Sequence, residues 1–102
     1  MLDKLTSADF TPHLNQKFHI HLESSASLEV ELIEVNLLGA APRDGETPER
    51  RRHFSLIFRA ADETYLPQRI YHLENAEMGT LDLFLVPIGP DKHGMRFEAV
   101  FT

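Results

Sequence analysis

The stretch TLDLFLVPIGPDKHGMRFEAVFT, residues 80–102, consists of two apolar runs joined by a polar segment that contains glycine and proline. Apolar residues recur at every second position in both runs: Leu81, Leu83 and Leu85 in the first, and Met95, Phe97, Ala99 and Phe101 in the second. Residues two apart point to the same face of a β-strand, so each run predicts a strand with one uniformly apolar face. Turn-forming residues lie between Gly89 and Gly94. We therefore expect a β-hairpin with strands at 80–88 and 95–102 and its apolar face in the core.

The opposite face of this hairpin carries Asp82, Arg96 and Glu98, but its other residues are apolar: Phe84, Val86, Ile88 and Val100. If the uniform face fills the core, these four side chains point outward, joined by Ile57 from an earlier strand. A soluble monomer seldom leaves a contiguous apolar surface of this kind exposed without a use. We predict that an N-terminal helix covers part of it and that the remainder is an interface with a protein partner or a second copy of the chain.

Composition places the chain among ordinary globular domains. Its 102 residues suit one domain, and 42% hydrophobic and 25% charged residues can form a single modest core. There is no cysteine, no apolar run of membrane-spanning length and no signal-peptide pattern at the N-terminus, which together favour a cytoplasmic protein without membrane association. The net charge of -6 argues against nucleic-acid binding, which requires basic side chains to neutralise phosphates.

The preceding chain predicts one helix and four more strands. Thr6 and Asp9 have the spacing of a capping box, and Pro12 limits the helix to about 7–14. Alternating apolar residues then predict further strands at 17–22, from Leu28 to Leu37, at 54–59 and at 67–75. Residues 39–52, with two prolines and no apolar periodicity, predict a long mobile loop. The loop is interpreted as a solvated connection, with a contact surface as the alternative.

Two local features indicate how these strands bend and end. In the strand from Leu28 to Leu37 the apolar phase shifts by one near Leu32 and Ile33, which predicts a β-bulge. Pro87 cannot donate a ladder hydrogen bond and predicts a strand end or an edge position.

Six short strands without intervening helices favour an all-β fold, namely a small six-stranded antiparallel β-barrel, with a β-sandwich as the alternative. A barrel this small is filled by its own side chains, so a roomy ligand cavity is not expected. The predicted core comprises Phe18, Ile20, Val30, Val35, Phe54, Leu56, Phe58, Leu83, Leu85, Phe97 and Phe101.

Four segments taken together resemble a family of small bacterial all-β domains of unknown function. They are LTSADFTPHLNQKF, HFSLIF, YHLENAEMGTLDLFLVPIG and FEAVF, and the resemblance spans nearly the whole chain. Some members of that family are encoded near phage-tail-collar-like genes. The resemblance therefore implies an accessory or structural role, for example in a phage-tail-like assembly, and it brings no catalytic residues.

Two histidines, His19 and His21, share one strand face and could chelate a metal, with His72 as a third candidate ligand. No further spacing typical of a metal site follows, so exposed polar positions remain the simpler interpretation. Ser55 lies within a strand rather than on a nucleophile elbow, and Glu29 and Glu31 suit the solvent face of an amphipathic strand. We therefore predict a non-catalytic structural or protein-interaction module without a cofactor, with a small-ligand or metal-binding β-barrel as the alternative.

Overall fold

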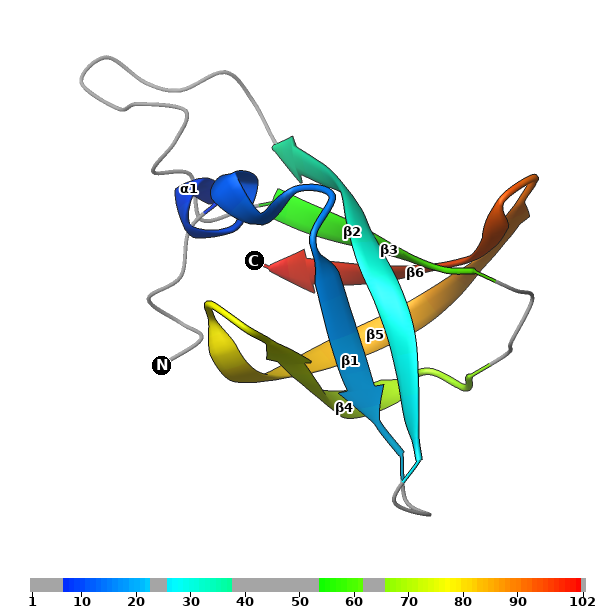
Figure 1. Ribbon diagram of the computed structural model, residues 1–102. Helices are drawn as coiled ribbons and strands as arrows, with labels where there is room; N and C mark the ends of the chain where they lie inside the picture. Colours follow the sequence, from blue (N-terminus) through cyan, green and yellow to red (C-terminus); the bar gives the residue numbers. More distant parts are fainter. Residues whose placement is uncertain (1–6, 23–25, 38–53, 62–65, 102) are drawn as a thin grey trace.

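The computed structural model describes residues 7–22, 26–37, 54–61 and 66–101, whose strands form one closed antiparallel barrel in the order β1-β2-β3-β6-β5-β4 (Figure 1). The elements are α1 (Ser7–Phe10), the 3₁₀ helix η2 (Thr11–His13), β1 (Lys17–His21), β2 (Ser27–Leu37), β3 (Phe54–Ala60), β4 (Arg69–Asn75), β5 (Gly79–Asp91) and β6 (Gly94–Phe101). The six-stranded barrel with a short N-terminal helix is thus confirmed in preference to the sandwich. The predicted loop at 39–52 and the capping residue Thr6 lie outside the described residues.

Apolar side chains fill the barrel interior. Phe18 of β1 and Phe58 of β3, the two strands that flank β2, meet edge to face with their ring centroids 5.2 Å apart. The fully buried large side chains are Phe10, Phe18, Phe54, Phe58, Phe97, Ile20, Leu32, Leu56, Leu73, Leu85 and Val30. Of the predicted core, only Val35 and Phe101 are partly exposed, and both pack against the cluster.

The N-terminal helical segment covers one end of the barrel, beside the ends of β3 and β6 (Figure 1). Phe10 is fully buried there, with its ring 5.8 Å from that of Phe54 and 5.6 Å from that of Phe101, and the latter two rings stack at 4.4 Å. Pro12 falls in η2, after the α-helical turn has ended. Proline has no backbone N–H to donate, so it could not continue the α-helix. Aromatic packing therefore fixes the position of this short segment.

The bulge predicted in β2 is present. The pairing of β2 with β3 shifts between Leu32 and Glu34, so Ile33 is the additional residue. On the other side of β2, Leu32 bonds to the segment before β1: the Asn15 N–H donates to the Leu32 carbonyl at 2.7 Å, and the Leu32 N–H donates to the Gln16 carbonyl at 3.1 Å. Asn15 adopts a positive φ of 69°, which asparagine tolerates better than most residues. The chain thereby turns from η2 into β1 against the bulge.

The C-terminal hairpin is longer than its sequence indicates, because β5 continues through both prolines to Asp91. The tight turn consists of Lys92 and His93, so the prediction of a turn beginning at Gly89 was wrong. The described pairing of β5 with β4 ends at Leu85, and beyond it β5 pairs with β6 alone, with a second register shift after Pro87. Proline is tolerated at such a position because no ladder bond is needed on the open side, and it also blunts the edge.

Asp91 and Gly94 attach the tip of this hairpin to β3. The Arg59 Nη1 donates to Asp91 Oδ2 at 3.1 Å, and the His93 N–H donates to Asp91 Oδ1 at 2.8 Å. A Cβ atom at Gly94 would lie 1.8 Å from the Ala60 carbonyl oxygen, so only glycine allows this approach of β6 to the end of β3.

We predict that Phe58→Ala lowers the free energy of unfolding by about 3–5 kcal/mol, because it leaves a cavity in the centre of the filled barrel. Urea denaturation followed by circular dichroism measures the change. Phe84→Ala is the matched control: that phenylalanine is 51% exposed, and its truncation should cost much less. Equal losses in the two variants would contradict the assignment of Phe58 to the core.

A second prediction concerns pH. The backbone N–H of His93 and the Arg59 guanidinium hold the pKa of Asp91 below its ordinary value of 3.8, outweighing the opposing effect of desolvation. A carboxyl whose pKa is lower in the folded protein stabilises it above the unfolded-state pKa, and this contribution disappears as the pH falls through the folded-state value. Asp91→Asn should therefore lower the melting temperature at about pH 7, and its difference from wild type should shrink towards about pH 3. A difference that is constant with pH would contradict this role.

Candidate interaction surface

An exposed apolar row crosses the outer face of β4, β5 and β6. Ile70 lies opposite Phe84 in the β4–β5 register. Val100 of the adjacent strand β6 lies two residues beyond Glu98, whose partner on β5 is Val86. Ile70, Phe84 and Val100 are 63%, 51% and 53% exposed, respectively. We call these three residues the apolar row. It is a convex strip on the outside of the barrel, formed where three strands each turn an apolar side chain away from the core.

The structure places most of the predicted interface residues on this face. Phe84, Ile88 and Val100 are exposed, and Val86 is half-buried. Ile57 is only 5% exposed, so its predicted place in an exposed patch is wrong. It lies in the middle of β3, where Glu34 of β2 and Glu98 of β6 lie opposite it on its two sides. A side chain flanked in this way has less contact with water than one near a strand end.

Ile70 belongs to the surface but was not predicted. The segment 67–75 leaves its inward face ambiguous, since both alternating sets contain an apolar residue. In the structure Tyr71 and Leu73 are buried, so Ile70 must face outward. The stronger apolar alternation of Tyr71 with Leu73 was the available signal.

The N-terminal helix does not cover the apolar row. Its large apolar side chain, Phe10, packs on Phe54 and Phe101 at the barrel end. Phe84 keeps half of its surface exposed with α1 in place. Of the two covers considered from the sequence, the helix is therefore ruled out for this row.

The histidines proposed as metal ligands lie on the outer face of β1 and β4. His21 is opposite His72 in the register, and His19 is two residues away on the same face. Each contacts a carboxylate: His21 Nε2 lies 3.0 Å from Glu74 Oε1, His19 Nε2 lies 3.7 Å from Glu29 Oε1, and His72 Nδ1 contacts Asp82 Oδ1. Within the described part of the chain, no group of three or more His, Asp or Glu side chains could hold a metal ion.

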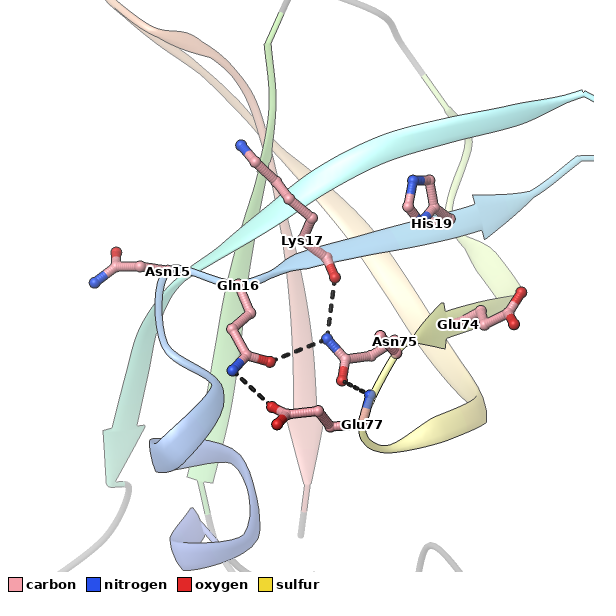
Figure 2. Close-up of a pocket in the computed structure, with 8 residues that line it drawn as sticks. Asn15, Gln16, Lys17, His19, Glu74, Asn75 and Glu77 are labelled. Atoms are coloured by element: carbon pink, nitrogen blue, oxygen red, sulfur yellow. Dashed lines mark hydrogen bonds between the residues drawn. The ribbon is translucent and has the colours of Figure 1, made fainter.

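An open polar depression of about 640 Å³ lies between the start of β1 and the β4–β5 turn (Figure 2). Asn75, only 4% exposed, forms its floor. Asn75 Nδ2 donates to the Lys17 carbonyl at 3.0 Å, while its Oδ1 accepts from the N–H groups of Glu77 and Met78 at 2.9 and 3.0 Å. Gln16 Nε2 donates to Glu77 Oε1 at 2.8 Å across the same gap. We call these contacts the Asn75 clasp.

The Asn75 clasp is a structural connection rather than a binding site. Every buried side-chain nitrogen or oxygen in the described residues has a hydrogen-bond partner, so the floor has no polar group that lacks one. His13 adds a further link, with Nδ1 2.9 Å from Gln16 Oε1 and 3.3 Å from Glu77 Oε1. The hydrogen bonds around the depression therefore connect η2, β1 and the β4–β5 turn to one another.

These features define a class of protein: a small antiparallel barrel domain whose interior is filled and whose distinctive surface is on the outside. The chain belongs to a family described as a domain of unknown function (DUF6916), whose model matches residues 5–101. No curated protein and no solved structure matches it significantly. No helix in the described residues is long and apolar enough to cross a membrane.

We predict that Asn75→Ala destabilises the fold by about 1–3 kcal/mol, because the Lys17 carbonyl and two turn amides lose their partner in a buried place. Thermal denaturation measures the effect. Asn36→Ala is the control, since that side chain donates only to the exposed Glu34 at 3.1 Å. If both variants melt together with wild type, Asn75 does not hold β1 to the turn.

Proposed function

We propose that this domain is a non-catalytic structural module that binds a partner protein through the apolar row. The observation that carries the proposal is the exposure of Ile70, Phe84 and Val100 in adjacent strands. The filled barrel interior supports it, because a ligand cavity would need volume that Phe18, Phe58 and the other core side chains occupy. Recognition is therefore proposed to take place on the outer surface.

The available polar groups support a non-catalytic role in the same way. Ser55 is 1% exposed, so a substrate would not reach its hydroxyl. His21 and His72 contact carboxylates and line an open depression of about 560 Å³. Acid–base catalysis usually takes place in a more enclosed cleft.

We further propose that the module is an accessory of a larger protein assembly, such as a phage-tail-like particle. The proposal follows from the resemblance of the four quoted segments to a family of small domains, which implies an accessory role in such an assembly. The small size of the apolar row also suits an accessory protein, whose contact with the assembly need not be large. Burying the rest of three half-exposed aliphatic and aromatic side chains contributes about 1 kcal/mol each. That total of about 3 kcal/mol falls short of millimolar affinity, so polar contacts must add to it.

The test is co-purification from the native cell, with light scattering of the isolated domain. Wild type should retain a defined partner, and Phe84→Asp should reduce the amount retained at least about tenfold, because a carboxylate would be buried without a partner. Thr80→Asp is the matched control, since Thr80 is exposed on the same strand and face.

Two results would count against the proposal. One is recovery of the same proteins with wild type and Phe84→Asp. The other is a wild-type domain that remains monomeric in light scattering and retains no partner at all. Concentration-dependent dimers that Phe84→Asp abolishes would instead identify the partner as a second copy.

A further inference from the structure

Two carboxylates border the apolar row, one on each side. Asp82 precedes Phe84 by two residues on β5, and Glu98 precedes Val100 by two residues on β6. Because β5 and β6 run antiparallel, the two carboxylates lie on opposite sides of the row. The rise along a strand places each about 7 Å from it. The Asp82 side chain is 55% exposed, and Glu98 is half-buried.

Neighbouring charges leave this surface acidic. Glu34 of β2 and Glu98 of β6 lie opposite Ile57 on its two sides. The Glu98 side of the apolar row therefore carries two carboxylates. The arginines of β3, β6 and β4 have contacts of their own. Arg59 pairs with Asp91 at 3.1 Å, and Arg96 Nε donates to the Gly89 carbonyl at 3.3 Å. Arg69, next to Ile70, has its guanidinium carbon 5.6 Å from the centroid of the Tyr71 ring. His72 Nδ1 contacts Asp82 Oδ1, and the whole chain carries a formal net charge of -6.

We propose that the apolar row binds a segment of a partner protein in which an apolar anchor is flanked on both sides by lysine or arginine. This inference rests on the proposed function and specifies the partner. The anchor would contact Phe84, while the two cations would face Asp82 and Glu98. Complementary charge supplies the polar contribution that three half-exposed apolar side chains lack, and it selects against acidic partners.

A second copy of the chain fits this surface poorly. Its own Asp82 and Glu98 would enter the interface with its apolar row, and like charges brought together disfavour association. The area is also small: a stable protein interface needs about 800 Å² from each partner, and three half-exposed side chains contribute a fraction of that. A basic segment from a different protein meets both constraints.

The spacing of the carboxylates predicts the spacing of the cations. Four residues of strand rise separate Asp82 from the level of Glu98, or about 13 Å. An extended segment spans that distance with one cation two residues before the anchor and one two residues after it. In a helix the same span requires about nine residues between the cations.

The experiment uses a random dodecapeptide library displayed on phage and selected against the immobilised wild-type domain at low salt. Synthetic copies of the enriched peptides are then titrated. Enriched sequences should carry lysine or arginine on both sides of an apolar residue. Binding should weaken about tenfold between about 50 and about 300 mM NaCl, because salt screens exposed charge pairs. The double variant Asp82→Asn with Glu98→Gln should weaken binding to a similar extent and remove most of the salt dependence.

The control double variant, Glu29→Gln with Glu31→Gln, removes the same charge from the outer face of β2 and should bind like wild type. Hydrogen exchange checks that each variant is folded. Peptides that need Phe84 but show no basic enrichment would overturn the charge inference and leave the proposed function standing. Peptides that bind Phe84→Ser as well as wild type would overturn both. Failure to enrich any peptide would overturn the inference of a linear segment, while the co-purification test decides the proposed function separately.

Discussion

Closure of the sheet between β1 and β4 is the constraint on which the rest of the structure depends. This pairing is short, running only from His19–Glu74 to His21–His72. Without it, two strand edges would expose unpaired backbone groups and the core would open on one side. The Asn75 clasp lies at the end of this pairing, where its amide binds the Lys17 carbonyl and the turn into β5. A buried side chain thus supplies hydrogen bonds at the point where the strand ladder ends.

A closed barrel of this size restricts where function can reside. Its aromatic and aliphatic side chains meet at the centre, and Phe10 packs against Phe54 and Phe101 at one end. Among the described residues, the exposed charged and apolar side chains of the strands lie on their outer faces. One part of that surface carries histidine–carboxylate pairs, and the adjoining part carries the apolar row between Asp82 and Glu98. The proposed binding role follows from this division between a filled interior and a patterned exterior.

The two bulges contribute to this arrangement in different ways. At Ile33 the additional residue changes which face of β2 is apolar, so both halves of a long strand can contribute to the core. At Ile88 the shift comes after the pairing with β4 has ended, in a segment with two prolines. The prolines leave β5 with few donors along its open edge, which discourages unspecific strand pairing there. A partner protein would therefore bind more readily to the side chains of the apolar row than to the backbone of this strand edge.

Alternation of apolar residues along the chain determined the strands, the bulge near Leu32, most of the core and the outward direction of Phe84 and Val100. These properties are local, because a strand's period of two assigns each residue to a face whatever its neighbours are. Only the tertiary structure decided that Ile57 is shielded between its neighbours on β2 and β6, that Ile70 lies beside Phe84, and that α1 packs on the barrel end instead of the apolar row. It also decided that β5 runs on to Asp91, through residues that favour a turn in isolation. Those outcomes depend on which strands are neighbours and in what register, and pairing between distant segments is not encoded in the periodicity of either one.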